Sequence, residues 1–345
     1  MVGRTPNKKI ITTLLPPKNK VAVLGSGSWA TALVKMLTDN NVKVYWYVRR
    51  EDDRQFIQEK RYNPAYLSSV QFRKRKLKIS SSIDESIKNA EILIFAIPSV
   101  FIVSELEKIT TSLVDKKIIS AIKGVIPDCL SVIGSYFHEK YKIPREDIGV
   151  ITGPCHAEEI AMERLSYLTV ASQNKQLTKT LARLLSNHYV RVKQSNDVIG
   201  TEYAAMLKNI YAIAAGIAHA LNYGDNFQSV LMSNAIREMK LFIKDVHRLK
   251  RDINNSAYLG DLLVTGYSVF SRNRTFGNMI GKGYTVKAAQ FEMNMIAEGY
   301  YASKSAKLIN SEFRTNTPII DAVYDILYEG KKPKKVFIKL SKKLN

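Results

Sequence analysis

Two lysines and one Arg/Asn-rich run are the parts of this sequence whose residue types and settings point most directly to chemistry. Lys123 follows the apolar run IISAI, and Lys208 lies inside the apolar helical segment EYAAMLKNIYAIAAG. A lysine in apolar surroundings can have its pKa lowered enough to exchange a proton near neutral pH. The run SRNR at 271–274 offers guanidinium and amide donors suited to a phosphate. The combination predicts proton exchange with a phosphorylated small molecule.

Two more segments place polar groups near predicted strand or helix ends. The run GPCHA at 153–157 follows GVIT, and GDL at 260–262 lies shortly before SRNR. We interpret Cys155 as a small packing residue rather than a nucleophile, and His156 as a capping or surface residue.

Each of these residues, taken singly, also has a purely structural interpretation. Lys123 would then face solvent at a strand end, Lys208 would extend its ammonium along the helix to water, and the SRNR arginines would form surface ion pairs. Their occurrence together with a dinucleotide-binding motif favours the functional interpretation.

A glycine-rich turn near the N-terminus supplies that motif. The segment GSGSWA at 25–30 has the pattern GxGxxA; it follows the predicted strand KVAVLG and opens a predicted helix. Gly25 permits the tight turn, Gly27 leaves room for a pyrophosphate, and Ala30 allows close helix–strand packing. The N–H groups of the helix N-terminus then attract the phosphates, so the context predicts a dinucleotide site.

The residues after the second predicted strand bear on the choice of cofactor. An NAD-specific fold usually has Asp or Glu there, whereas this chain has Arg49-Arg50, with Glu51 only afterwards. Arginine can pair with the 2′-phosphate of NADP, which a carboxylate would repel. Stacking of Arg49 on adenine would suit either cofactor, so NAD and NADP both remain candidates.

These residues need a scaffold, and the hydrophobic patterns predict an α/β fold followed by helices. Short apolar runs predict strands at 20–25, 42–48, 91–98, 116–124 and 147–154, alternating with helical stretches, which is typical of a parallel-rich sheet covered on both faces. From Val198 to about His219 the chain is Ala-rich and apolar on much of its circumference, as in a helix buried in a large core. We predict a tail at 1–18, a dinucleotide-binding domain at 19–197 and an all-α domain at 198–345.

Composition excludes several classes of protein. The 345 residues suggest about two domains. Two cysteines, Cys129 and Cys155, make neither a disulfide framework nor a cysteine zinc site, and no histidines have paired ligand spacing, so we expect no metal. No apolar run approaches the ~20 residues of a membrane helix, and the N-terminus lacks the apolar core of a signal peptide. We therefore expect a cytoplasmic protein without membrane insertion.

The positive charge decides nothing by itself. There are 52 Lys and Arg against 31 Asp and Glu, a net charge of +21. Nucleic acid, a membrane surface and small anions would all be attracted. Clusters occur only at 71–78 and in the C-terminal run GKKPKKVFIKLSKKLN, so we interpret the charge as a solvated surface and expect no nucleic-acid partner.

The order and spacing of several motifs resemble the bacterial-type NAD(P)-dependent glycerol-3-phosphate dehydrogenase family, from about Lys20 to Gly330. These motifs are VAVLGSGSWATAL, AIPS, SAIKG, ITGPCHAEEIA, EYAAMLKNIYAIAAGIAHAL, GDN, GDLLVT, SRNRTFG and AEGYYASK. The resemblance implies a Rossmann-like domain followed by an all-α substrate domain. It also implies interconversion of dihydroxyacetone phosphate and sn-glycerol 3-phosphate, which supplies glycerol phosphate for phospholipid synthesis.

Carried over residue by residue, the resemblance implies a full site. Lys208 matches the proton acceptor of the oxidative direction and also contacts substrate. The other implied substrate ligands are Lys123, Gly153, Cys155, Asp261, Ser271, Arg272 and Asn273. Besides Gly25 and Gly27, the implied cofactor ligands are Ser28, Trp29, Arg49, Arg50, Lys123, Ala157, Arg272 and Glu298. The family usually carries Ser or Thr at the position of Cys155 and glycine at that of Ala30, and the segments before Lys18 and beyond 330 are outside the resemblance.

Two alternatives compete with this interpretation. The first is a related two-domain dehydrogenase that acts on a hydroxy acid or sugar acid; SRNR close to GDLLVT favours a phosphate instead. The second is a non-enzymatic basic protein that uses a nucleotide fold to bind nucleic acid, which would need clustered basic residues with stacking aromatics. We expect a homodimeric NAD(P)-dependent enzyme acting on a small phosphorylated substrate.

Overall fold

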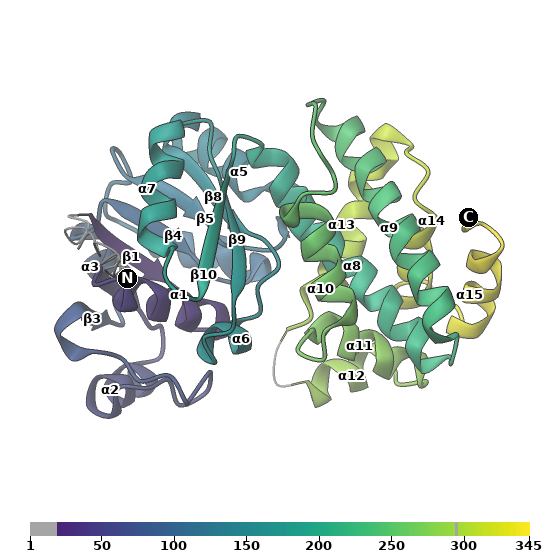
Figure 1. Cartoon of the computed structure of the whole chain (residues 1–345), viewed down its shortest axis with the longest axis horizontal. Helices are drawn as coiled ribbons and strands as arrows, with labels where there is room; N and C mark the ends of the chain where they lie inside the picture. The colour runs from purple at the N-terminus through teal and green to yellow at the C-terminus, as the bar shows by residue number, and fades with distance from the viewer. Residues whose placement is uncertain (1–18, 294–295) are drawn as a thin grey trace, which may run out of the picture.

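The chain folds into a sheet-containing half and a helical half that lie side by side (Figure 1). The computed structural model describes residues 19–293 and 296–345, so the predicted tail at 1–18 lies outside the described residues. The last strand of the sheet ends at Ser195 and the first helix of the second half begins at Val198. The predicted fold class, a Rossmann-like α/β domain followed by an all-α domain, is confirmed; the domain limits stay predictions.

The sheet has eight strands in the order β10-β9-β8-β5-β4-β1-β2-β3. All neighbours are parallel except β8 and β9. The strands are β1 Lys20–Leu24, β2 Lys43–Tyr47, β3 Leu77–Ser80, β4 Ile92–Phe95, β5 Lys117–Ser120, β8 Ile148–Thr152, β9 Ser166–Ala171 and β10 Val190–Ser195, with a small hairpin of β6 Val125–Ile126 and β7 Ser131–Val132. The chain runs outward in one direction from β1 and in the other from β4, so the ligand crevice is expected at their carboxyl ends.

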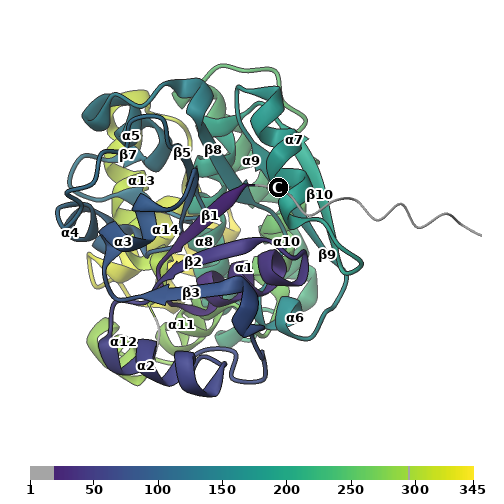
Figure 2. The same cartoon turned by 90° about the vertical axis from the view of Figure 1, so that its left-hand side faces the viewer.

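Helices cover both faces of the sheet, because successive side chains of each buried strand point to opposite faces. In β1, Val21 and Val23 pack in the core under α1, α6 and α7, whereas Ala22 and Leu24 pack in the core under α3, α4 and α5. Figure 2 shows this arrangement end-on. The helices are α1 Ser28–Asp39, α2 Glu51–Lys60, α3 Ile83–Lys88, α4 Ile102–Leu106, α5 Ile133–Tyr141, α6 Ala157–Ala161 and α7 Lys175–Leu185.

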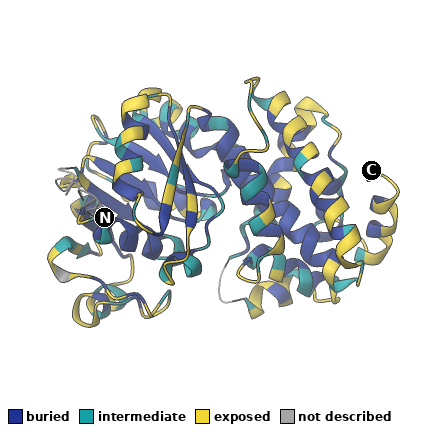
Figure 3. Ribbon diagram, viewed as in Figure 1, coloured by how far each residue is buried: buried dark blue, intermediate teal, exposed yellow. Residues whose placement is uncertain are grey.

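The second half is built around one helix, α8, which spans Val198–Ala220 and is buried along nearly its whole length (Figure 3). Small residues let α11 approach it closely: a Cβ on Gly216 would meet the carbonyl oxygen of Arg274 at 2.0 Å, and one on Gly277 would meet that of Ile213 at 2.1 Å. The remaining elements are α9 Gly224–Val246, the π-helix η4 Ser256–Gly260, α10 Asp261–Tyr267, α11 Arg272–Gly281, α12 Val286–Glu292, α13 Glu298–Phe313, α14 Pro318–Leu327 and α15 Pro333–Ser341.

A buried carboxylate ties the start of α8 to the segment that leads into α10. Asp197 is 4% exposed and accepts a hydrogen bond from Gly200 N at the helix start. It also accepts from Arg251 Nε at 2.7 Å and from the Tyr258 hydroxyl at 2.5 Å. Burial alone would raise the pKa of Asp197, but the bonds from Arg251 and Tyr258 outweigh it and the pKa is lowered.

Asp197→Asn should destabilise the fold by about 3–5 kcal/mol at neutral pH, because it leaves the buried Arg251 guanidinium without its counter-charge. Because the pKa of Asp197 is lowered in the folded state, its contribution is present above its unfolded pKa and is lost as the pH falls through the folded one. Urea unfolding measures the loss. Lys307→Ala, which removes an exposed ion pair with Asp321, is the control and should cost less than about 1 kcal/mol; an equal loss in both variants would contradict the role of Asp197.

Candidate active site

A cleft of about 950 Å³ lies between the carboxyl ends of the parallel strands and the helices α8, α10, α11 and α13. It brings together most of the site residues predicted from the sequence, which come from segments far apart in the chain. The predicted residues that line it are Gly27, Ser28, Trp29, Lys123, Cys155, Ala157, Lys208, Asp261, Ser271, Arg272, Asn273 and Glu298. A second hollow continues from it past Gly25 and Arg49.

The glycine turn has the geometry that a dinucleotide phosphate needs. Gly25 has φ of +120°, and a Cβ there would lie 2.5 Å from the carbonyl oxygen of Ala96, so no other residue fits without strain. A Cβ on Gly27 would meet nothing within 4 Å, so the space over this residue is open. No side chain caps the N-terminus of α1, which leaves its first N–H groups free for a ligand. The turn therefore fits a pyrophosphate.

The second hollow has the character of an adenosine pocket. It is lined by Tyr47, Tyr66 and Phe101, and by Arg49, whose side chain is 60% exposed. Arg49 lies 3.6 Å from Glu105, a buried carboxylate that also accepts from the Tyr47 hydroxyl at 2.8 Å. Arg50, in contrast, does not line either hollow; it pairs with Asp53 at 3.7 Å beside the start of α2.

A buried ion pair occupies the floor of the cleft. Lys208, on α8, places its Nζ 2.5 Å from Oδ1 of Asp261, the first residue of α10, and the two side chains are 3% and 2% exposed. Thr152 Oγ1, at the end of β8, lies 3.5 Å from Oδ2 of the same carboxylate. The π-helix η4 ends directly before Asp261 and so sets where this carboxylate points.

The environment of Lys208 tunes its acidity. The pKa of Lys208 is lowered to about 8, chiefly by burial; the negative charge of Asp261 opposes this shift, and the positive charge of Lys123 adds to it. The ammonium therefore holds its proton at neutral pH but can release it slightly above, which suits an acid in one reaction direction and a base in the other.

A chain of amide hydrogen bonds links four elements around the cleft. Asn209, next to Lys208, donates to the carbonyl oxygen of Lys123 at 2.9 Å and accepts from Asn273 Nδ2 at 3.0 Å. Asn273 in turn accepts from Gly299 N at 2.8 Å. This chain fixes the loop after β5 against α8, α11 and the start of α13.

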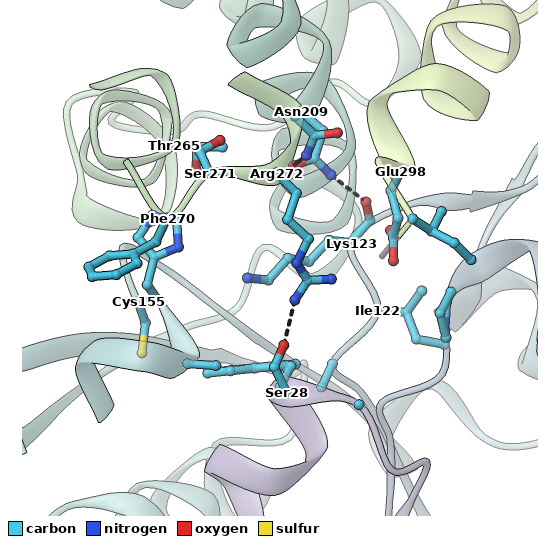
Figure 4. Close-up of a pocket in the computed structure, with 18 of the residues that line it drawn as sticks. Ser28, Ile122, Lys123, Cys155, Asn209, Thr265, Phe270, Ser271, Arg272 and Glu298 are labelled. Carbon is cyan, nitrogen blue, oxygen red and sulfur yellow. Dashed lines mark hydrogen bonds between the residues drawn. The ribbon is translucent and has the colours of Figure 1, made fainter. Parts of the chain in front are cut away.

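Arg272 crosses the cleft from the helical half and hydrogen-bonds the Ser28 hydroxyl at the start of α1 (Figure 4). Lys123 Nζ lies 4.9 Å from the centre of the Trp29 ring, a cation–π contact. Glu298 is half-buried, but its Oε2 atom is buried and has no hydrogen-bond partner among the described residues, as is also true of Trp29 Nε1. Two unpaired buried polar atoms beside the glycine turn are the groups that a bound cofactor would satisfy.

Cys155 and His156 both face the cleft. Burial raises the pKa of the Cys155 thiol to about 12, which agrees with a packing role and not with a nucleophile. His156 occupies the N-cap position of α6, but its half-buried side chain makes no capping hydrogen bond; it lies 3.5 Å from the carbonyl oxygen of Val264 and has a pKa lowered to about 4, mainly by burial. Gly153 lies outside the lining; with φ of +116° it forms the turn after β8.

Several lining residues escaped the sequence analysis. Asn209 lies in the same apolar helix as Lys208, so its polarity there was a usable signal. Thr265 lies one helical turn after Asp261, to whose carbonyl oxygen it donates at 2.6 Å. Phe270 and Glu105 carried no signal, because an aromatic before a helix and a glutamate within one are ordinary.

Neither a metal centre nor a membrane segment emerges from residues 19–293 and 296–345. No group of three or more His, Cys, Asp or Glu side chains in these ranges could hold a metal ion. No helix in them is long and apolar enough to cross a bilayer.

Comparison with known proteins identifies the family. The model described as NAD-dependent glycerol-3-phosphate dehydrogenase N-terminus matches residues 20–178, and that of the C-terminus matches residues 197–338. The chain is 34% identical over 318 residues to glycerol-3-phosphate dehydrogenase [NAD(P)+] of Bacillus pumilus, covering 91% of each chain, and 34% identical over 313 residues to that of Macrococcus caseolyticus, covering 90% of this chain and 94% of the relative.

A solved structure supports the same family. A crystal structure of glycerol-3-phosphate dehydrogenase from Coxiella burnetii superposes with a TM-score of 0.87 at 27% identity, covering 94% of this chain and 98% of that one. With the dinucleotide turn and the buried lysine in place, the chain belongs to the NAD-dependent glycerol-3-phosphate dehydrogenase family and is an NAD(P)-dependent oxidoreductase.

Proposed function

We propose that the cleft interconverts dihydroxyacetone phosphate and sn-glycerol 3-phosphate, with Lys208 carrying the proton. The observation that supports this most is the buried Lys208–Asp261 pair. It lines the same cleft as the glycine turn and as hydrogen-bond donors suited to a phosphate. A hydroxy-acid dehydrogenase would need to bind a carboxylate, and a nucleic-acid-binding protein would have no use for a buried proton carrier.

The start of α11 is the proposed site of the substrate phosphate. Ser271 caps this helix, and Arg272 and Asn273 occupy its first turn. A helix N-terminus and an arginine fork both favour a dianion. Arg272 already contacts Ser28 at the pyrophosphate turn, so its guanidinium lies where the substrate and cofactor phosphates would meet.

The proposed chemistry is a hydride transfer coupled to a proton transfer. The glycine turn and Glu298 would hold NAD(P)H, which would supply the hydride for the carbonyl carbon. Lys208 donates its proton to the carbonyl oxygen, so that the C=O bond becomes an alcohol, and takes the proton back in the oxidative direction. Lys123, held by Asn209 and Trp29, places positive charge where the oxygen becomes negative.

Glu298 and Ala157 are proposed to complete the cofactor site. Glu298 presents an unpaired carboxylate oxygen at the start of α13, suited to accept from an amide or hydroxyl group. Burial raises the pKa of Glu298, and Lys123 and Arg272 oppose that rise.

A homodimer and a cytoplasmic location are proposed as well. Cys129 and Cys155 are both unpaired, which suits a reducing compartment. Val269 and Phe291 are 77% and 91% exposed, and an interface with a second copy would cover such apolar surface.

Lys208→Met should remove most turnover, because methionine fills a similar length but carries no proton. We expect the wild type to oxidise reduced cofactor when dihydroxyacetone phosphate is added, and the variant to be slower by about 10²–10⁴-fold in kcat. Cofactor binding, followed by fluorescence quenching, should be retained. Lys240→Met, on an exposed position of α9, is the matched control. Near-wild-type turnover of the folded Lys208 variant would refute its role.

The pH dependence of kcat/KM should report Lys208. Reduction needs the protonated amine, so it should fall as the pH rises through about 8, whereas oxidation should rise over the same range. Asp261→Asn removes the charge that raises the pKa of Lys208, so its inflection should move to lower pH. Lys123→Met removes a charge that lowers this pKa, so its inflection should move to higher pH. Shifts of the same sign in both variants would contradict the assignment.

Arg49→Ala should weaken the binding of NADPH more than the binding of NADH if the Arg49 guanidinium pairs with the 2′-phosphate. We expect KM for NADPH to rise about tenfold or more, the loss typical of a charge-assisted hydrogen bond, with little change for NADH. Lys60→Ala removes the same charge from the far end of α2 and serves as the control. Equal losses with both cofactors would show that Arg49 only stacks on the adenine.

A further inference from the structure

A second large groove lies at the end of the helical half that is remote from the sheet, between α14 and α15 (Figure 1). It has a volume of about 1070 Å³. Its floor is apolar, with Ala322, Val336 and Leu340, and its rim is rich in lysine. The lysines that line it are Lys331, Lys332, Lys335, Lys339 and Lys343. None of these residues belongs to the active-site cleft.

The lysines along α15 form a stripe without counter-charges. Lys335 and Lys339 lie four residues apart on α15, and Lys332 and Lys343, just before and just after the helix, continue the spacing of three and four residues. Two aspartates also line the groove, but each is already paired: Asp321 with Lys307 at 2.6 Å and Asp325 with Lys331 at 2.9 Å. The sequence has no Asp or Glu from 330 to 345.

This charge pattern works against the stability of the helix that carries it. The first turn of α15 contains Lys334 and Lys335 and no acidic residue, although positive charge at a helix N-terminus opposes the helix dipole. Lys335 and Lys339, at i, i+4 spacing on the helix, also repel each other. An anionic partner would relieve both conflicts.

The helix is firmly fixed, so its stripe is a rigid surface. Phe337 is fully buried and packs against Tyr223 and Phe227. At the end of the chain, Asn234 Nδ2 donates to the carbonyl oxygen of Asn345 at 2.7 Å. Because the apolar face of α15 is already used in the core, the helix can offer a partner its charge but cannot insert.

We propose that the lysine stripe of α15 binds the surface of an anionic phospholipid bilayer, with the helix lying flat and without insertion. Lysine acts as a point charge suited to many diffuse phosphates, and the stripe contains no arginine fork. No aromatic side chain lines the groove, so base stacking is not available for single-stranded nucleic acid. The active-site cleft lies on another side of the helical half and would stay accessible. The proposal is independent of the proposed function.

Vesicle co-sedimentation of the full chain tests this proposal. We expect binding to phosphatidylcholine vesicles that contain phosphatidylglycerol, and none to pure phosphatidylcholine. Binding should be lost between roughly 0.1 M and 1 M salt, where the Debye length falls from about 10 Å to about 3 Å. Replacing Lys332, Lys335, Lys339 and Lys343 by Gln should weaken the vesicle partition constant by about 10²–10³-fold, at about fivefold per lysine.

A charge-matched variant separates this surface from the general positive charge. Lys60, Lys88, Lys179 and Lys287 are exposed elsewhere, and their replacement by Gln should leave vesicle binding nearly unchanged. Both variants should keep wild-type turnover in solution. An equal loss in the two variants, binding to neutral vesicles, or no binding to anionic vesicles would overturn the proposal. Displacement by millimolar inorganic phosphate, or stronger binding to DNA or RNA than to vesicles, would overturn it too.

Discussion

The ion pair between an almost fully buried ammonium group on an apolar helix and a buried carboxylate is the interaction on which the rest of this structure depends. Taking the charge of Lys208 out of water is costly unless an opposite charge meets it at close range, and Asp261 does so at 2.5 Å. Asp261 keeps its place because η4 leads directly into it. The helix η4 is held in turn by the hydrogen bond that the Tyr258 hydroxyl donates to Asp197. The Lys208–Asp261 pair and the contacts of Asp197 at the start of α8 therefore belong to one connected set of contacts.

The same helix also sets how closely its neighbours approach. Gly216 and Gly277 bring the backbones of α8 and α11 together, which lets Asn273 reach Asn209 and lets Arg272 extend toward the sheet. Larger residues at these glycines would separate the two helices and move Arg272 and Asn273 away from Lys208. The small residues of the helical half are in this sense as much a part of the site as its charged groups.

The sequence predicts the central strands and many of the residues that line the cleft better than it predicts the periphery. The strands around β1 and β4 are continuous apolar runs, which the sequence shows directly. The strands β3 and β10 lie at the two edges of the sheet and contain exposed residues, and neither was predicted. The strand β9 was not predicted either. Lys208 was found through its apolar setting, but its pairing with Asp261, 53 residues away, depends on tertiary packing that no local pattern contains.

The continuity of α8 has a consequence for how this protein can vary in length. Its N-terminal end is tied through Asp197 to Tyr258, and Lys208 is tied to Asp261, only three residues further along the same segment. Each residue added to or removed from a helix turns everything beyond it by about 100°. One insertion between Asp197 and Lys208 would therefore carry the lysine out of the cleft. We therefore expect insertions and deletions in loops that make none of these contacts, whereas α8 itself can change only by substitution.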